Sequence, residues 1–407
     1  MINIAVLGFG VVGSGVVHVL DINSERVTHN AGQDIKVKYI FDIREVSDSP
    51  YSSLFVKDFE TILNDPEVTV VVEVIGGTGA ALDYTKRCLE AGKSVVTSNK
   101  ELVAGFGSEL LNLAKEKNVN YLFEASVGGG IPVIRPLTQC MSANNINEIY
   151  GILNGTTNYI LTDMQRNGAD FSDALKEAQL KGYAESDPTA DIEGHDANRK
   201  ICILSSLAFG KHIYPRQVPT EGITGVTTED MFYADLLGYK IKLLGRARTV
   251  GNKFSVYVAP HLVSRHTLLA DTDDVLNAII IRGNAVGTVT FCGAGAGKLP
   301  TASAVVADVI DAVKHLHSRR WLCWDEGSAD LISDPLLLDS AWYIRTDASR
   351  SKIEKEFGSV LFADNGEIEK ETSDNAFITA VMNGKMISDL LERGITAKSQ
   401  FRILGDY

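Results

Sequence analysis

The segment from Gly182 to Lys200, GYAESDPTADIEGHDANRK, brings five carboxylates and a lysine close together, and an apolar stretch, ICILSSLAFG, follows it directly. At about 100° per residue in a helix, Asp196 and Lys200 fall on the same side as the apolar residues. Unpaired charges are costly to bury on such a side. Two interpretations follow from this placement. One is a buried structural ion pair, and the other is a pocket whose carboxylates hold a substrate ammonium while the lysine handles a proton.

The N-terminus has the pattern of a phosphate-binding turn. A short apolar run predicts a buried strand, a G-x-G-x-x-G sequence follows it, and an apolar helix comes next. In this context the first glycine permits a tight turn, the second lets the backbone approach a pyrophosphate, and the third allows close packing of helix on strand. The N–H groups at the start of the helix favour the phosphates. The residues expected to contact the dinucleotide here are Gly8, Gly10, Val11, Val12 and Gly13.

The cofactor type depends on the end of the second predicted strand, Ile35 to Phe41, where Asp42 follows directly. A carboxylate at this position accepts hydrogen bonds from the ribose hydroxyls and repels a 2′-phosphate, which favours NAD. Asp42 lies 29 residues after Gly13, beyond the usual spacing of about 20. The polar segment 23–34 accounts for the longer connection. Arg44 is near enough to serve a 2′-phosphate instead, so NADP stays open.

Composition limits the kinds of partner. With 407 residues the chain should form two or three domains. Its net charge of −13 excludes nucleic acid or an anionic membrane surface as the main partner. No apolar run is long enough to span a bilayer, and the first residues form a strand rather than a signal peptide, which predicts a cytoplasmic protein. Five scattered cysteines without metal-ligand spacing predict buried, reduced thiols.

Strand and helix patterns alternate over residues 1–130, which predicts a Rossmann-type, doubly wound parallel sheet. The pattern places a helix at about 107–117 and a last strand at 121–127. Ligands in such sheets bind beyond the carboxyl ends of the strands. Lys100 follows one of these strands, and it is either a solvated turn residue or a catalytic group at the nicotinamide end. The same rule selects Gly76, Gly77, Ser98, Asn99 and the turn 124–130.

From residue 131 the pattern changes. Residues 131–292 predict an α+β substrate-binding and dimerisation domain with strands at 239–250, 253–262, 276–282 and 285–291. A second glycine-rich loop with Gly297 precedes a helix from about Thr301, and residues 293–330 either complete the nucleotide domain or form a plain hinge. The tail, 340–407, reads as βαββαβ, the order of a ferredoxin-like module.

With these residues in view, the chain resembles homoserine dehydrogenase over essentially residues 1–330. The matching blocks are GFGVVGSGVV, SNKEL, EASVGGGIPV, GILNGTTNYIL, GYAESDPTADIEGHDANRK and GAGAGKLPTASAVVADVI. The resemblance implies reduction of L-aspartate 4-semialdehyde to L-homoserine with NADH or NADPH, on the path to threonine, methionine and isoleucine. It also implies a homodimer or homotetramer and makes the tail ACT-like.

Carried over by position, the resemblance makes Lys200 and Lys100 catalytic. It adds Asp196 to the catalytic residues, where it would position Lys200 or a bridging water. It implies a monovalent-cation site, expected to hold sodium, on the backbone carbonyls of Glu124, Val127, Gly129 and Ile131. The residues that it places at the substrate are Glu185, Asp191, Gly155 and Thr156.

The chain also departs from the family pattern. Ala190 replaces a second acidic residue, and Phe41-Asp42 replaces the Arg-Asp of many relatives, which supports NAD. The tail has the segment 347–350 in place of the glycine-containing turn of ligand-binding ACT domains, so threonine inhibition does not follow.

Two rival functions are compatible with part of the pattern. One is a non-catalytic NAD-linked sensor with the tail as its output module, which would bind cofactor without turnover. The other is a related dehydrogenase acting on another amino-acid semialdehyde or on aspartate, because an ammonium pocket alone does not fix the substrate's chain length.

Overall fold

The computed structural model describes residues 1–44, 49–318, 322–364 and 374–405, and the chain forms two compact units. The first unit comprises Met1–Ile146, Cys202–Pro215 and Gly283–Ser328. The second comprises Asn147–Ile201, Arg216–Arg282 and Ala329–Tyr407.

The first unit contains a six-stranded parallel sheet with the strand order β3-β2-β1-β4-β5-β6. This is the order of a dinucleotide-binding Rossmann sheet, as the sequence predicted. Central strand β4 is buried because its valines lie on both faces of the sheet. The strands are β1 (Ile2–Leu7), β2 (Ile35–Phe41), β3 (Phe55–Val56), β4 (Val68–Glu73), β5 (Ser94–Thr97) and β6 (Tyr121–Leu122).

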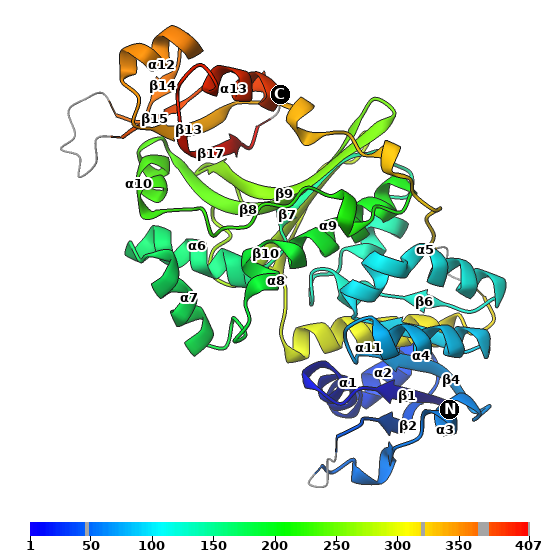
Figure 1. Cartoon of the computed structure of the whole chain (residues 1–407). Coiled ribbons are helices and arrows are strands. Elements are labelled where there is room, and N and C mark those ends of the chain that lie inside the picture. Colours follow the sequence, from blue (N-terminus) through cyan, green and yellow to red (C-terminus); the bar gives the residue numbers. More distant parts are fainter. Residues whose placement is uncertain (45–48, 319–321, 365–373, 406–407) are drawn as a thin grey trace. The chain divides into compact units, whose positions relative to one another are not determined.

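Helices alternate with these strands along the chain. Helix α11 packs against α1 and against β4 and β5, so a segment near residue 300 completes the core begun at the N-terminus (Figure 1). Gly15 makes this approach possible, because a Cβ there would lie 2.9 Å from the carbonyl oxygen of Lys298. The helices are α1 (Val11–Ile22), α2 (Ser24–Ala31), α3 (Phe59–Leu63), α4 (Gly79–Glu90), α5 (Lys100–Glu116) and α11 (Lys298–Lys314), and strand β11 (Gly287–Ala294) also belongs to this unit.

Helix α5 begins at Lys100, so the expected start near residue 107 was wrong. The Asn99 side chain caps the helix by accepting a hydrogen bond from the Leu102 N–H at 3.1 Å. Gly105 and Gly107 both lie inside the helix. Gly107 is required there by packing, because a Cβ would lie 2.2 Å from Cζ2 of Trp324.

Two further boundaries differ from expectation. Strand β6 ends at Leu122, and Glu124–Ser126 form a 3₁₀ turn instead of continuing the strand. Helix α11 starts at Lys298, one turn before the expected position. Both differences reflect turn contacts that the strand and helix periodicities do not encode.

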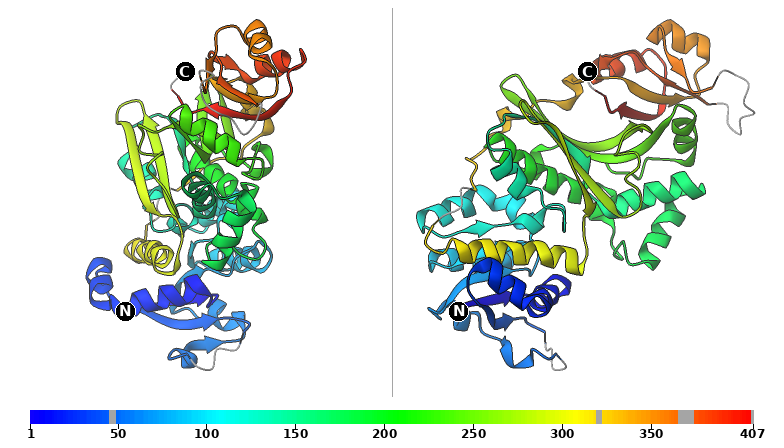
Figure 2. Two further views of the ribbon diagram at one scale, coloured as in Figure 1. Left: turned by 90° about the vertical axis from the view of Figure 1, so that its left-hand side faces the viewer. Right: turned by 180° about the vertical axis from the view of Figure 1, so that it is seen from behind.

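The second unit is built on a mixed sheet in which eight strands follow the order β10-β7-β8-β9-β17-β13-β15-β14. Figure 2 shows β8 and β9 as long, twisted strands, and α6 packs on β8. The strands are β7 (Ile146–Ile152), β8 (Tyr239–Val250), β9 (Lys253–Ser264), β10 (Leu276–Gly283), β13 (Trp342–Thr346), β14 (Leu361–Phe362), β15 (Asn375–Ile378) and β17 (Ala397–Ile403).

The helices of the middle segment are α6 (Gly155–Asn167), α7 (Phe171–Leu180), α8 (Thr189–Ile192), α9 (His195–Phe209) and α10 (Thr228–Leu236). The tail adds α12 (Arg350–Phe357) and α13 (Gly384–Leu391), with the two short strands β12 (Asp339–Ser340) and β16 (Met382–Asn383) paired to each other. The third expected strand of the tail is split into β15 and β16.

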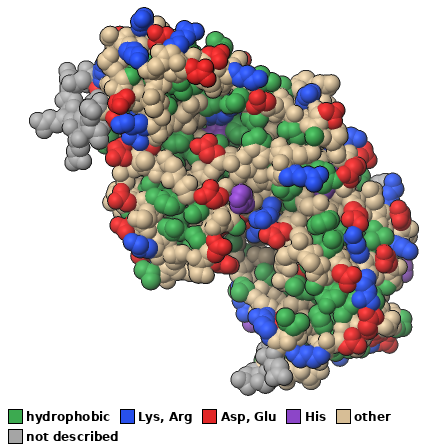
Figure 3. Space-filling model, in the orientation of Figure 1, with side chains coloured by type: hydrophobic (Ala, Val, Ile, Leu, Met, Phe, Trp, Pro, Cys, Tyr) green, Lys and Arg blue, Asp and Glu red, His purple; other side chains and the backbone are tan. Residues whose placement is uncertain are grey.

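On the face shown in Figure 3, acidic and basic side chains are mixed, and neither sign covers a large area alone. None of the described helices is long and apolar enough to cross a membrane. Cys88 and Cys202 are buried, whereas Cys140, Cys292 and Cys323 are exposed, so the expectation of five buried thiols was wrong for three of them.

Candidate active site

The three glycines of the N-terminal turn each have a distinct geometric reason. Gly8 has φ +97°, and a Cβ there would lie 2.9 Å from the carbonyl oxygen of Val74. A Cβ on Gly13 would lie 1.9 Å from the Gly8 carbonyl oxygen, so helix α1 could not approach the strand. Gly10 instead faces open space, where the nearest atom to a Cβ is Nη2 of Arg44 at 3.9 Å. The open position is the one expected to admit a pyrophosphate.

Helix α1 starts at Val11 and has no capping side chain, which leaves its N-terminal dipole available to a phosphate. A cavity of about 390 Å³ lies beside this turn. It is lined by Gly8, Gly10, Phe41, Asp42, Ile43, Arg44, Val74, Ile75, Ala80 and Tyr84.

Asp42 lies at the end of β2 as expected and is buried. Its Oδ2 accepts a hydrogen bond from the Phe9 N–H at 2.7 Å, and the Arg44 guanidinium donates to both carboxylate oxygens at 2.8 and 3.0 Å. The bonds from Arg44 hold the pKa of Asp42 well below its usual range, with the Phe9 bond adding to the effect. The carboxylate is therefore ionised at the point where a ribose would lie.

The carboxyl edge of β4 and β5 carries Gly76, Gly77, Ser98 and Lys100. Gly76 and Gly77 have positive φ, +89° and +67°, and a Cβ on either would meet nothing within 4 Å. Asn99 Nδ2 donates to the Gly77 carbonyl oxygen at 2.7 Å and so ties the two loops together. Lys100 is the half-buried first residue of α5 at this edge.

Glu73, which the sequence analysis did not single out, is the last residue of β4 and contacts both strand ends at this edge. It is fully buried, and its carboxylate accepts hydrogen bonds from the Ile75 N–H at 2.8 Å and the Thr97 hydroxyl at 2.7 Å. Burial raises its pKa. A lone glutamate at the end of a valine run was the available signal, because only a fixed role explains a carboxylate inside a central strand.

The Glu124 side chain holds together the two ends of the loop that is expected to bind a cation. Its carboxylate accepts backbone hydrogen bonds at 2.7–2.9 Å from Val133, Ile134 and Arg135, which closes the loop 125–132. The Glu124 N–H donates to the buried Asp308 at 2.7 Å.

The second glycine-rich loop lies directly on this one. A Cβ on Gly129 would lie 2.5 Å from the Gly295 carbonyl oxygen, and the Gly130 N–H donates to the Ala294 carbonyl at 3.1 Å. Gly297, with φ +126°, then leads into α11. The two glycine-rich segments therefore form one packed structure within the first unit.

The second unit holds the carboxylate–lysine cluster. Lys200 Nζ donates to Asp196 Oδ2 and to the Leu153 carbonyl oxygen, both at 2.7 Å. Both side chains are buried, as the helical periodicity predicted, with Asp196 3% and Lys200 8% exposed.

Asn154 is the centre of this cluster, and the sequence analysis missed it. Its Nδ2 donates to Asp191 Oδ1 at 2.7 Å and to Asp196 Oδ2 at 2.8 Å, so one amide joins the two carboxylates. Its Oδ1 accepts from the Thr157 N–H at 2.8 Å and caps α6. The asparagine between a strand and a helix in GILNGTTNYIL was the signal, because asparagine is a preferred N-cap.

The ionisation of Asp191 is shifted by its surroundings. Burial raises the pKa of Asp191, the negative charge of Asp196 raises it further, and the Asn154 bond and the Lys200 charge oppose this rise. A second cation beside Asp191 would stabilise its ionised form. The cluster can therefore bind an ammonium group.

The remaining expected substrate residues differ in their surroundings. Thr156 is buried, its hydroxyl donates to the Tyr183 carbonyl at 2.7 Å, and its side chain also opposes the rise in the pKa of Asp191. Gly155 packs against the backbone of Val275. Glu185 is exposed, and among the described residues its carboxylate has no hydrogen-bond or ion-pair partner. Lys100 belongs to the first unit and these residues to the second.

A Rossmann sheet with its phosphate-binding turn and a buried carboxylate–lysine cluster define a dinucleotide-dependent oxidoreductase. Family models agree with this class and specify it. The model described as "Homoserine dehydrogenase, NAD binding domain" matches residues 8–124, and the one described as "Homoserine dehydrogenase" matches residues 132–310.

Individual relatives agree. The chain is 45% identical to a homoserine dehydrogenase of Neisseria gonorrhoeae over 77% of its own length and 72% of the relative's. It is 42% identical to one of Pseudomonas aeruginosa, over 85% and 82% of the two chains. The chain belongs to the homoserine dehydrogenase family.

Solved structures match nearly the whole chain. A homoserine dehydrogenase from Thiobacillus denitrificans superposes with a TM-score of 0.88 at 36% identity, covering 99% of this chain and 98% of the other. One from S. aureus gives 0.83 at 33% identity, covering 100% and 99%. A hyperthermophilic archaeal homoserine dehydrogenase in complex with NADPH gives 0.65 at 28% identity, covering 76% and 97%.

The protein is thus an NAD(P)-dependent oxidoreductase that interconverts L-aspartate 4-semialdehyde and L-homoserine in threonine, methionine and isoleucine biosynthesis. The expected family and activity are confirmed.

Proposed function

We propose that Lys200 is the proton donor and acceptor of this reaction, that Lys100 supports it at the nicotinamide end, and that Asp191 with Glu185 binds the substrate ammonium. The observation that carries the proposal is the joining of Asp191, Asp196 and Lys200 through Asn154. A buried lysine held in one orientation beside two carboxylates fits proton transfer at an amino-acid substrate.

The proton step follows from the position of Lys200. When bound, the reduced cofactor (NADH or NADPH) would supply the hydride to the semialdehyde carbon, and the oxidised cofactor (NAD or NADP) would accept it from homoserine in the reverse direction. Lys200 protonates the alkoxide oxygen as the semialdehyde is reduced, and takes the proton from the hydroxyl in the reverse direction. Asp196 and the Leu153 carbonyl, both 2.7 Å from Nζ, fix where that proton lies. Asp191 is left to attract the ammonium.

We propose NAD as the preferred cofactor. Asp42 is ionised and accepts the Phe9 N–H, so a 2′-phosphate in this cavity would meet a negative charge. Arg44 is already paired with Asp42 and its side chain is 61% exposed. The NADPH complex of the archaeal relative supports the opposite choice. Comparison of the two cofactors decides between them.

We propose a sodium ion on the carbonyl oxygens of Glu124, Val127, Gly129 and Ile131. The fit is supported by hydrogen bonding within the described residues, where the carbonyls of Val127, Gly129 and Ile131 accept no protein hydrogen bond. Unpaired backbone carbonyls in a buried loop require another partner. Replacement of sodium by choline should lower turnover if this site is used, and unchanged turnover would remove it.

We propose that the tail is an ACT-like module. Its strand order, β17-β13-β15-β14, with helices after the first and third main strands, is that of a ferredoxin-like fold.

A homodimer or homotetramer is proposed from the exposed strand β11, whose residues alternate between exposed and half-buried. Light scattering of the purified protein would test the subunit count.

The direct test is the initial rate of oxidation of L-homoserine with NAD and with NADP, followed by nicotinamide absorbance. Lys200→Ala and Lys100→Ala should each lower kcat by at least about 100-fold, with cofactor affinity nearly unchanged. Lys176→Ala is the matched control, because Lys176 is exposed and, within the described part of the chain, pairs with Asp173 alone, at 3.1 Å. Near-normal kcat in both site variants would refute the roles. Cofactor binding without turnover on homoserine or semialdehyde would favour a sensor or another substrate.

A further inference from the structure

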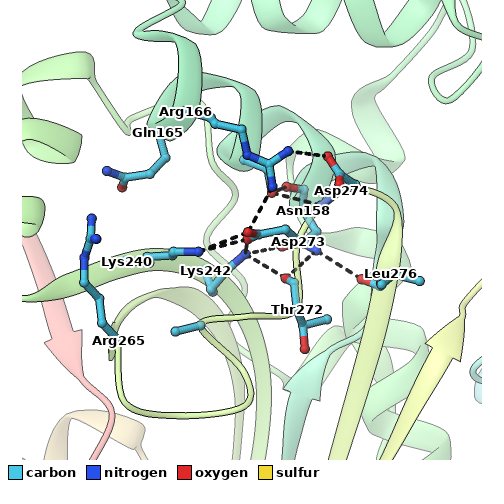
Figure 4. A network of polar contacts seen from close by, with 12 residues as sticks. Asn158, Gln165, Arg166, Lys240, Lys242, Arg265, Thr272, Asp273, Asp274 and Leu276 are labelled. Atoms are coloured by element: carbon cyan, nitrogen blue, oxygen red, sulfur yellow. Dashed lines mark hydrogen bonds and ion pairs between the residues drawn. The ribbon is translucent and has the colours of Figure 1, made fainter.

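A buried polar network lies beside the first turn of α6, in the second unit. Lys242, on β8, is 2% exposed, and its Nζ donates to Asn158 Oδ1 at 2.9 Å, the Thr272 carbonyl at 2.8 Å and Asp273 Oδ1 at 2.9 Å (Figure 4). All three N–H donors of the ammonium therefore have an acceptor. We call Lys242, Asn158 and Asp273 the anchor network.

Asn158 carries the network into α6. It is 1% exposed, and its Nδ2 donates to the Thr272 carbonyl at 3.0 Å and to the Leu276 carbonyl at 3.1 Å (Figure 4). Its carboxamide thus binds both ends of the loop 272–276 and the lysine at once. The Asn158 N–H also donates to the Asn154 carbonyl at 3.3 Å, one helical turn earlier.

The same loop contacts α6 at a second point. A Cβ on Gly155 would lie 2.7 Å from the Val275 carbonyl oxygen, so the helix start and the loop are in close backbone contact. Gly155 directly follows Asn154. The loop 272–276 therefore contacts the first turn of α6 at Gly155 and again at Asn158, one and four residues after Asn154.

A buried lysine at this position costs desolvation free energy that an apolar side chain would avoid, so packing alone does not explain it. Burial lowers the pKa of Lys242, and the pairing with Asp273 opposes that shift. Asp273 also pairs with Lys240 at 3.0 Å and with Arg166 at 3.1 Å (Figure 4). Buried ion pairs add little net stability over apolar packing, but a fully satisfied network holds its members in one geometry.

We propose that the anchor network positions the substrate pocket by fixing Asn154, so that its amide meets Asp191 and Asp196 together. Lys242 is a positioning residue that acts through Asn158 and the loop 272–276. The inference rests on the proposed roles of Asn154, Asp191 and Asp196. A displacement of about 1 Å at a reacting group lowers rates by about 100-fold, so a smaller loosening of Asn154 should still be measurable.

The test is Lys242→Met, which keeps the length of the side chain and removes the three hydrogen bonds. We expect kcat/KM for L-homoserine to fall about tenfold with a raised KM, while the KM for the cofactor stays within about twofold. Lys240→Met is the matched control, because Lys240 lies on the same strand and pairs with Asp273 but donates to neither Asn158 nor the loop carbonyls. It should stay within about twofold of the parent in every constant.

A second variant keeps the inference testable if Lys242→Met does not fold. Asn158→Ala removes the hydrogen bonds to the Thr272 and Leu276 carbonyls without replacing the lysine, and it should raise the KM for L-homoserine in the same way. The combination of Lys242→Met with Asn158→Ala should lose less than the product of the single losses, because both act through one carboxamide.

The outcomes separate this inference from the proposed site. A folded Lys242→Met with a lowered Tm and unchanged kinetic constants would show a merely structural network and overturn the inference. If Asn154→Ala lowers activity in that case, the site assignment stands alone. If Asn154→Ala also has no effect, the proposed site itself is wrong.

Discussion

Removal of the Asn154 amide is the perturbation that tests the site most directly. Asn154→Ala takes away the two hydrogen bonds to ionisable carboxylates, at 2.7 Å to Asp191 and 2.8 Å to Asp196. A hydrogen bond to a charged group is worth about 1.5–3 kcal/mol, and entering water restores part of it. We therefore expect about 3 kcal/mol less transition-state stabilisation, which is roughly a 100-fold fall in kcat/KM for L-homoserine.

A second effect of the same change is on folding. Asn154 caps α6 through the Thr157 N–H, and loss of an N-cap costs about 1 kcal/mol of stability. The assay is steady-state oxidation of L-homoserine at saturating NAD, with cofactor affinity measured separately by nicotinamide fluorescence. Cofactor affinity should not change, because the side chain of Asn154 bonds to Asp191, Asp196 and Thr157 and is not part of the dinucleotide turn.

The matched control is Asn167→Ala, which replaces an exposed asparagine at the other end of α6 that donates to Asp163 at 2.7 Å. It should leave kcat/KM within about twofold. If Asn154→Ala stayed within about threefold of the parent while folded, the amide would not organise the carboxylates and the reasoning would be refuted.

Asp42→Asn should raise the ratio of kcat/KM for NADP over NAD about tenfold or more, because it removes a negative charge next to the expected 2′-phosphate position; an unchanged ratio would show that Asp42 does not select the cofactor. Burial and the neighbouring carboxylate raise the pKa of Asp191. As the pH falls, Asp191 therefore loses its charge at a pH above the usual aspartate pKa of about 4. The acid limb of kcat/KM for L-homoserine should lie above that pH and disappear in Asp191→Asn, and its persistence in that variant would assign it to another group. Gly107→Ala should destabilise the fold by about 1–3 kcal/mol, because its Cβ would lie 2.2 Å from an indole carbon, whereas Gly105→Ala in the same helix meets nothing within 4 Å. Gly105→Ala should instead stabilise the fold by about 0.5–1 kcal/mol. Equal melting temperatures, or equal urea midpoints, for the two variants would contradict the packing account.

Local pattern was sufficient for the features that depend on neighbouring residues. The G-x-G-x-x-G spacing predicted the turn because each glycine answers a backbone constraint within a few residues, as the positive φ of Gly8 and the contact of Gly13 with the Gly8 carbonyl show. The helical period likewise predicted that Asp196 and Lys200 are buried together. The helical period gave no signal for Asn198, two residues after Asp196, which is also buried and donates to the Val218 carbonyl and the Thr220 hydroxyl.

The sequence by itself determined the order of strands and helices, the phosphate-binding turn, the position of Asp42 and the shared face of Asp196 and Lys200. Each of these follows from residue periods and short-range backbone geometry. Only the tertiary structure decided that Asn154 joins Asp191 and Asp196, which lie 37 and 42 residues after it in the chain. It also decided that Lys242 reaches Asn158 across 84 residues. A hydrogen bond between distant residues depends on how the elements pack, and no local period carries that information.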